Sequence, residues 1–191
     1  MKPTVPARGK KILITGVSCV GKSTIGRRLA EILDCAFYDL DLELERHFRM
    51  PISRLKALSL TGYSFRQKAS RVLGRILHEN CDRNLIVALP PSGLRDWHWK
   101  VIKKHGGIVI ALSDSAENIL KRIVFYDDDS NRIEKELDER RKALYLREIR
   151  KDIGYFRRFY RKANFHVELS GAGVAESTEK VKAALEDYCG Q

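Results

Sequence analysis

One stretch near the N-terminus combines residue types that can together hold the phosphate groups of a nucleotide. Gly16 to Ser23 fits G-x-x-x-x-G-K-[ST], a pattern whose glycines let backbone N–H groups turn toward phosphate oxygens. Lys22 would reach the β- and γ-phosphates, and the Ser23 hydroxyl would ligate Mg²⁺. The positive end of a following helix would add to the attraction. The predicted phosphate-binding residues are Gly16, Val17, Ser18, Cys19, Val20, Gly21, Lys22, Ser23 and Thr24.

The elements on either side of this loop are those that such a site needs. Residues 11–15 form a short apolar run that predicts a buried strand, and Ile25, Leu29, Ile32 and Leu33 follow the loop at helical spacing. A glycine-containing turn before an ordinary helix is the competing interpretation. The strand before the motif and the amphipathic helix after it favour nucleotide phosphate binding.

The remainder of the chain alternates between strand-like and helix-like patterns. Such alternation is typical of a parallel sheet with helices on both of its faces. We therefore predict one α/β domain over residues 1–191, a three-layer α/β/α P-loop kinase fold with a five-stranded parallel sheet and a lid near residues 127–148. The predicted strands are 11–15, 36–39, 85–89, 108–112 and 165–169, and the predicted helices after the first are 42–48, 52–59, 65–78, 97–105, 116–125, 133–163 and 177–188.

Two carboxylates follow the second predicted strand, where ligands bind in open α/β sheets. Asp39 and Asp41 are separated by one residue, so both can project in the same general direction once the strand has ended. One could hold Mg²⁺ while the other orients or deprotonates an acceptor hydroxyl. Capping of the helix that begins near Leu42 is the alternative role for either residue.

Composition narrows the class of protein and of partner. Hydrophobic residues make up 43% and charged residues 32% of the 191 residues, as in a globular protein that folds without disulfides or metal. No apolar run approaches the roughly 18 residues of a membrane span, and the N-terminus lacks a signal-peptide core, so we expect a cytoplasmic protein with no membrane partner. The four cysteines form no C-x-x-C pair, and this makes zinc and disulfide sites weak interpretations.

The net charge of +11 suggests an anionic partner, with nucleic acid as one candidate and a polyanionic small substrate as another. Basic residues concentrate at 132–162, where they are mixed with acids and aromatics rather than gathered into a tail. This mixture favours a mobile arginine-bearing segment over phosphates. A nucleic-acid groove is the less favoured alternative and stays open.

Four segments resemble the shikimate kinase family. The phosphate loop runs into S-T-x-G-R-x-L-A, matched by residues 23–30, and F-x-D-x-D is matched by residues 37–41. The F-R pair that opens a later helix is Phe65-Arg66, and residues 141–145 are similar to the family's R-x-P-L-Y. The resemblance covers most of the chain but is specific only over the first 70 residues.

The resemblance implies an ATP-dependent kinase that phosphorylates a hydroxyl of a small anionic acceptor, with shikimate as the best single candidate. It implies that Asp39 helps Ser23 to position Mg²⁺, and that Asp41 holds the acceptor hydroxyls and is the candidate base. Arg66 and Arg141 would grip the acceptor carboxylate. Arg122 would contact the nucleotide, and Arg132, on the lid, would neutralise phosphate charge. We expect the protein to be a monomer.

The acceptor half departs from the family pattern. Pro90-Pro91-Ser92 replaces a glycine triplet beside the acceptor ring, leaving only Gly93 for close backbone approach, and proline removes an N–H and adds a ring. Ala69 replaces the glutamate that pairs with the arginine of F-R, and Arg132 is not followed by the family's P-L-L. The alternatives are therefore another small-molecule kinase, acting on a sugar acid or a nucleotide, and a nucleotide-dependent regulatory or RNA-binding protein.

Overall fold

The structure is a computed structural model that describes residues 9–127, 129, 131–134 and 136–190. The remaining positions, 1–8, 128, 130, 135 and 191, belong to the predicted domain 1–191, and three of them belong to the predicted lid 127–148. Those parts of both predictions lie outside the described residues.

A five-stranded parallel sheet forms the centre of the fold. Its strands are β1 (Lys11–Thr15), β2 (Ala36–Asp39), β3 (Leu85–Ala88), β4 (Ile108–Ser113) and β7 (Phe165–Glu168). They lie in the order β2-β3-β1-β4-β7, and every neighbouring pair is parallel. The three inner strands are continuous apolar runs because both of their faces are covered. The predicted five-stranded parallel sheet is confirmed.

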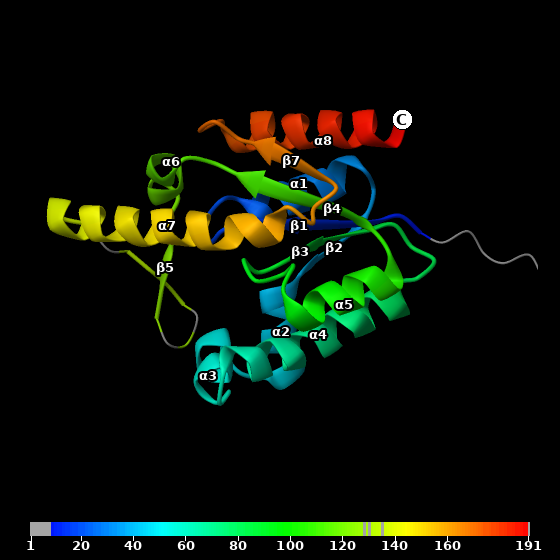
Figure 1. Ribbon diagram of the computed structural model, residues 1–191, viewed down its shortest axis with the longest axis horizontal. Helices are drawn as coiled ribbons and strands as arrows, with labels where there is room; N and C mark the ends of the chain where they lie inside the picture. The colour runs from blue at the N-terminus through cyan, green and yellow to red at the C-terminus, as the bar shows by residue number, and fades with distance from the viewer. Residues whose placement is uncertain (1–8, 128, 130, 135, 191) are drawn as a thin grey trace, which may run out of the picture.

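Helices cover both faces of this sheet, as predicted. Figure 1 shows α1 (Lys22–Ile32) and α8 (Val174–Gly190) together on one side of the sheet, and α4 (Gly62–Glu79) and α5 (Asp96–His105) together on the other. The other helices are α2 (Leu40–Phe48), α3 (Ile52–Ala57), α6 (Ala116–Leu120) and α7 (Glu139–Tyr160). Among the helices that the structure describes, none is both long and apolar enough to cross a bilayer.

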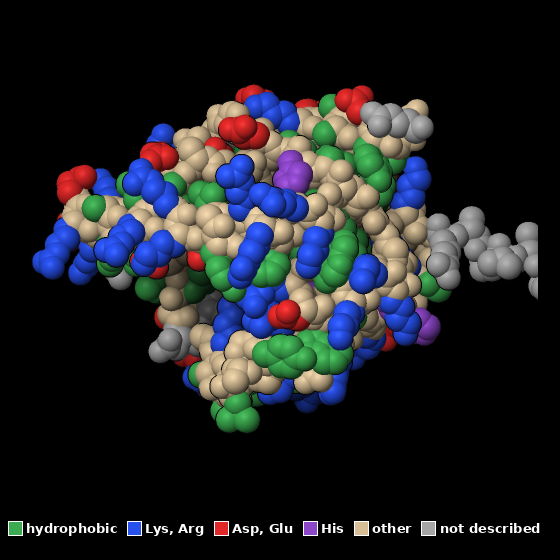
Figure 2. Space-filling model, viewed as in Figure 1, with side chains coloured by type: hydrophobic (Ala, Val, Ile, Leu, Met, Phe, Trp, Pro, Cys, Tyr) green, Lys and Arg blue, Asp and Glu red, His purple; other side chains and the backbone are tan. Residues whose placement is uncertain are grey.

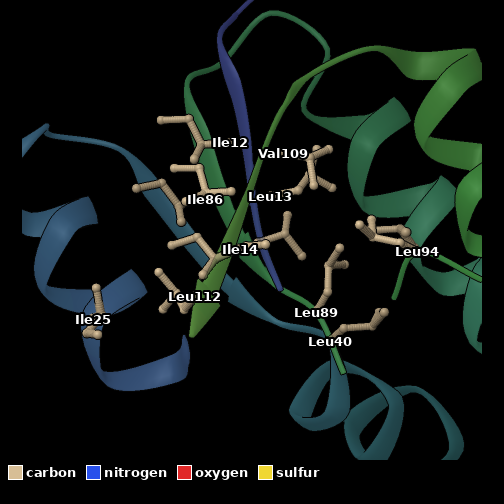
Figure 3. Packing of buried hydrophobic residues seen from close by; sticks show 14 of the residues in the cluster. Ile12, Leu13, Ile14, Ile25, Leu40, Ile86, Leu89, Leu94, Val109 and Leu112 are labelled. Atoms are coloured by element: carbon tan, nitrogen blue, oxygen red, sulfur yellow. The ribbon is translucent and has the colours of Figure 1, made fainter. Parts of the chain in front are cut away.

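The core explains why the strands hold their positions. Side chains alternate along β1, so Ile12 and Ile14 face the layer of α1 while Leu13 faces the opposite layer, beside Val109 and Leu94 (Figure 3). Leu13 and Ile14 are fully buried. Burying such a side chain contributes about 1.5–3 kcal/mol, so the centre of the sheet is the most strongly stabilised part of the fold.

One predicted helix, residues 116–125, is wrong in its second half. The structure ends α6 at Leu120 and places Phe125–Tyr126 in a short strand, β5, which pairs antiparallel with β6 (Arg132–Ile133). Helical spacing continued past Leu120 in the sequence, but Phe125 and Ile133 pair across the hairpin instead. Aromatic and β-branched residues at these positions favour extended backbone.

The charged helix predicted over residues 133–163 begins later and ends earlier than expected. Its first residue is Glu139, because the Asp138 side chain accepts a hydrogen bond at 2.7 Å from the backbone N–H of Arg141 and so caps the helix. Its last residue is Tyr160. In Figure 1 the N-terminal half of α7 projects beyond the edge of the sheet.

Candidate active site

The phosphate-binding loop connects β1 to α1 and depends on its glycines. Gly16 has φ 150, and a Cβ there would lie 2.6 Å from the carbonyl oxygen of Leu112. Gly21 has φ 113 and occupies the N-cap position of α1. Side chains at these two positions would clash or strain the backbone, so glycine is required for the turn that presents backbone N–H groups to an anion.

Lys22 is the first residue of α1 and its side chain folds back over the loop. Its Nζ donates a hydrogen bond at 2.8 Å to the carbonyl oxygen of Val17. Burial lowers the pKa of Lys22 to about 8, although the nearby Asp41 carboxylate opposes this shift. The ammonium therefore lies at the loop, where a phosphate oxygen could replace the carbonyl as its acceptor.

Asp39 caps a helix and also contacts Ser23. Its Oδ1 accepts from the backbone N–H of Asp41 at 3.0 Å and of Leu42 at 3.5 Å, so it is the N-cap of α2. Its Oδ2 accepts a hydrogen bond from the Ser23 hydroxyl. The two oxygens predicted to hold Mg²⁺ are thus in contact, and the cap fixes the carboxylate beside Ser23.

Asp41 differs from Asp39 in having an unsatisfied oxygen. Its Oδ1 is buried and has no hydrogen-bond partner among the described residues. Burial raises the pKa of Asp41, while Lys56 is the strongest of the neighbours that counteract the shift. A buried carboxylate oxygen without a donor is costly unless a ligand supplies one, which is the property expected of a group that receives an acceptor hydroxyl.

These groups face a single cavity of about 860 Å³. Ser18–Thr24, Asp39 and Asp41 line it, as do Pro90 and Pro91 after β3 and residues 172–174 at the start of α8. The carboxyl ends of β2 and β3, the phosphate loop and α2 therefore surround the same space, as the strand order requires. The volume is ample for a nucleotide with a small acceptor beside it.

Arg122, which was predicted to contact the nucleotide, also lines this cavity. Its position depends on Asp114, a residue that sequence reasoning missed. Asp114, at the end of β4, has a side chain with 0% exposure and accepts from Arg122 Nη1 at 2.8 Å. The same carboxylate accepts from Asn118 Nδ2 and the backbone N–H of Gly171. Arg122 Nη2 donates to the carbonyl oxygen of Ala172 at 3.1 Å.

Asp114 thereby connects Arg122, through hydrogen bonds, to the loop before α8. The only sequence signal was its suitability as a helix cap, whereas its contacts with Gly171 span 57 residues. Burial acts to raise the pKa of Asp114, but the hydrogen bonds from Asn118, Ser115, Gly171 and Arg122 outweigh it, and the pKa is lowered.

We expect Asp114→Ala to raise KM for ATP at least tenfold and to destabilise the fold by about 3 kcal/mol, the low end for breaking a buried ion pair, since Arg122 is 28% exposed. Because the folded-state pKa is lowered, this stability is present above the unfolded pKa and is lost as pH falls. The difference in free energy of unfolding between the wild type and Asp114→Ala should therefore decrease below about pH 4. Chemical denaturation at several pH values and initial rates test both effects.

Glu117→Gln is the matched control for this prediction. Glu117 lies on α6, three residues after Asp114, and pairs with Arg150. Both of these side chains are more than half exposed, and neither lines the cavity. Its replacement should change stability by less than about 1 kcal/mol and leave KM for ATP unchanged. Equal effects of the two substitutions would contradict a specific role for Asp114.

Six predicted site residues do not line the cavity as far as the described residues form it: Gly16, Val17, Arg66, Gly93, Arg132 and Arg141. Arg132 is exposed on the β5–β6 hairpin. Arg141 lies in the first turn of α7, 55% exposed and 3.8 Å from Asp138. Gly93 is buried in the turn after β3, where a Cβ would lie 2.6 Å from that of Leu89, so its glycine is required by packing.

Arg66 has a new partner in place of the missing glutamate. Its Nε donates to Asp96 Oδ2 at 2.9 Å, and its side chain is only 14% exposed. Ala69, the position of the family's glutamate, is fully buried in the core. The carboxylate that holds this arginine therefore comes from α5 rather than from its own helix.

The aromatic residues of α7 belong mainly to the core. Phe156 and Phe159 pack against the hydrophobic cluster and Tyr160 is 8% exposed, whereas Tyr155 is 43% exposed. Three of the four rings are therefore poorly placed for stacking on nucleic-acid bases, as packing residues would be.

Comparison with known proteins identifies relatives over most of the chain. The shikimate kinase family model matches residues 18–186. A shikimate kinase from Novosphingobium aromaticivorans is 30% identical over 117 residues, 60% of each chain, and so the match spans less than two thirds of that relative. One from Caldicellulosiruptor saccharolyticus is 27% identical over 90% of this chain and 93% of its own.

Solved structures agree on the fold. A shikimate kinase from Bacteroides thetaiotaomicron superposes with a TM-score of 0.76 at 17% identity, covering 94% of this chain and 99% of that one. A shikimate kinase from Acinetobacter baumannii in complex with shikimate gives 0.69 at 24% identity and covers 94% of both chains. Since the family match extends from the phosphate loop into α8, over a fold that these structures share, the chain belongs to the shikimate kinase family.

Proposed function

We propose that the protein transfers the γ-phosphate of ATP to a hydroxyl group of shikimate. The observation that carries this proposal is the buried, unsatisfied Oδ1 of Asp41 in the same cavity as Lys22 and Ser23. A phosphate-binding loop and a desolvated carboxylate in one cavity are what phosphoryl transfer to a hydroxyl needs. The family relationship makes shikimate the first acceptor to test.

Each residue has a defined task in this proposal. The loop N–H groups and Lys22 bind the phosphates, and Arg122 contacts the nucleotide from the opposite wall. Asp41 orients the acceptor hydroxyl and accepts its proton, and its raised pKa makes it a stronger base than an ordinary aspartate. Arg132, on the β5–β6 hairpin, would neutralise phosphate charge when the lid closes.

Ser23 and Asp39 fit a magnesium site of the kind that kinases share with their substrate. No cluster of three or more His, Cys, Asp or Glu side chains suited to a metal occurs among the described residues. This is consistent with Mg²⁺ chemistry, because the ion typically takes one or two protein oxygens and completes its shell with water and phosphate. When bound, it would neutralise charge on the β- and γ-phosphates.

A coupled assay for ADP release tests the function. Turnover with Mg-ATP that increases on addition of shikimate supports the proposal. If a sugar acid such as gluconate or a nucleoside monophosphate stimulates turnover and shikimate does not, the protein is a kinase with a different acceptor. Nucleotide binding without stimulation by any of these would favour the regulatory or RNA-binding alternative. The proposal includes a monomeric cytoplasmic enzyme, and light scattering after gel filtration tests the monomer.

The value of kcat/KM for ATP should fall both at low pH and at high pH. On the alkaline side, loss of the Lys22 proton above about pH 8 weakens phosphate binding in the free enzyme. On the acid side, protonation of Asp41 removes the base, and its raised pKa shifts this limb above the ordinary aspartate range. Lys22→Arg should move the alkaline limb to higher pH, since arginine keeps its proton. An unshifted alkaline limb in this variant would exclude Lys22 as its source.

A further inference from the structure

Two arginines, Arg66 in α4 and Arg95 at the N-cap of α5, share one carboxylate. Arg66 Nε lies 2.9 Å and Arg95 Nη2 lies 3.8 Å from the same oxygen, Oδ2 of Asp96. The side chains are 14%, 21% and 35% exposed, respectively, so the group is mostly desolvated. Two guanidinium groups with one carboxylate leave a net charge of +1, which is what a single acceptor carboxylate would neutralise.

Arg95 is held rigidly and has an unused donor. Its Nη1 donates to the Tyr155 hydroxyl at 2.6 Å, and its guanidinium carbon lies 4.9 Å from the ring centre of Phe159. Its Nε is buried and has no acceptor among the described residues. The cost of a buried unsatisfied N–H is removed when a ligand oxygen accepts from it, and a pre-positioned guanidinium loses little entropy on binding.

The position of Arg95 follows from the altered segment after β3. Pro90 and Pro91 line the cavity, and the Pro91 carbonyl oxygen accepts from the Tyr160 hydroxyl at 3.1 Å. Backbone bonds from Gly93 to Pro90 and from Arg95 to Ser92 close a tight turn that leads from the cavity to α5. Figure 2 shows a hollow below α7 and above α3, with basic side chains along its edge.

Arg141 cannot act together with Arg66 in this arrangement. Tyr155, which contacts Arg95, is 14 residues beyond Arg141 on α7, so the two lie about 21 Å apart along the helix axis. One carboxylate spans a few ångströms. The arginine at the required place is therefore Arg95.

We propose that Arg95 and Arg66 together bind the carboxylate of the acceptor, and that Asp96 positions both guanidinium groups. The inference rests on the proposed function, because it assumes an acceptor that carries a carboxylate. Arg95 takes the place that the sequence pattern assigned to Arg141. The forked N–H groups of arginine match a carboxylate and do not match an uncharged amide equally well.

The test compares shikimate with its carboxamide as acceptors. Arg95→Gln should lower kcat/KM for shikimate at least tenfold and leave kcat/KM for the carboxamide and KM for ATP within about twofold. Arg95→Lys, which keeps the charge but loses the fork, should show an intermediate ratio. Because both acceptors are measured on the same variant, partial unfolding would lower both and leave their ratio unchanged.

Two further substitutions decide between the arginines. Arg147→Gln is the control, because Arg147 is an exposed residue of α7, the helix that carries Arg141. It should leave the ratio of kcat/KM for the acid to that for the amide unchanged. Arg141→Gln tests the rival residue, and a fall in the ratio for this variant but not for Arg95→Gln would overturn the inference. If the wild-type enzyme turns over shikimate but Arg95→Gln leaves the acid-to-amide ratio unchanged, the inference is overturned and the proposed function stands. Wild-type enzyme that turns over neither acceptor overturns the proposed function and with it this inference.

Discussion

Replacing Lys22 with methionine should lower kcat/KM for ATP by about 10²–10³-fold, the loss expected when one group that stabilises developing charge is removed. Methionine keeps most of the length and the apolar stem of lysine while removing the charge. We expect little effect on the stability of the fold, because the ammonium donates one hydrogen bond within the described part of the chain, to the carbonyl oxygen of Val17. Steady-state rates and thermal unfolding of the same samples measure the two effects separately.

Arg28→Met is the control for this substitution. Arg28 lies on the same helix, is 58% exposed and pairs with Glu31 at 3.6 Å. Its replacement removes the same charge from α1 without touching the cavity, and the rate should stay within about twofold. A loss below tenfold for Lys22→Met, or an equal loss for both variants, would contradict the role assigned to Lys22.

The nucleotide side of the site could be predicted because its determinants are local in sequence. Residues 16–24 form a continuous motif between one strand and one helix, and Asp39 and Asp41 follow directly on the next strand. Short apolar segments and, at residues 165–169, an alternation of apolar and polar residues were sufficient to predict all five strands of the sheet. The β5–β6 hairpin was missed, since two-residue strands have no periodicity to read.

The proposed acceptor site could not be predicted because its contacts join distant segments. The pair of Arg66 and Asp96 spans 30 residues, and the contact of Arg95 with Tyr155 spans 60. In the sequence, Arg66 had lost its glutamate and Arg95 had no pattern of its own. Only the packing of α4 against α5, and of α7 over the turn after β3, brings these charges together.

Asp41→Asn should lower kcat by about 10²–10⁴-fold, the range expected for loss of a general base, with KM for ATP nearly unchanged. Asparagine has the shape of aspartate but cannot accept the proton of the acceptor hydroxyl. The residual activity of Asp41→Asn should lack the acid limb of the pH profile of kcat/KM, because that limb is assigned to Asp41. Glu43→Gln, on the same helix and paired with Arg46 at 2.6 Å, is the control and should retain wild-type rates.

The stability of Asp41→Asn separates a catalytic loss from a structural one. The pKa of Asp41 is raised in the folded state, so stability is fully present below the unfolded pKa and is lost as pH rises through the folded pKa. Asparagine carries no charge and avoids this loss, and the variant should be at least as stable as the wild type at pH 7. A less stable, inactive variant would mean that Asp41 holds the fold. A stable, inactive variant would mean that the protein keeps a desolvated carboxylate, at a cost in stability, for proton transfer from its acceptor.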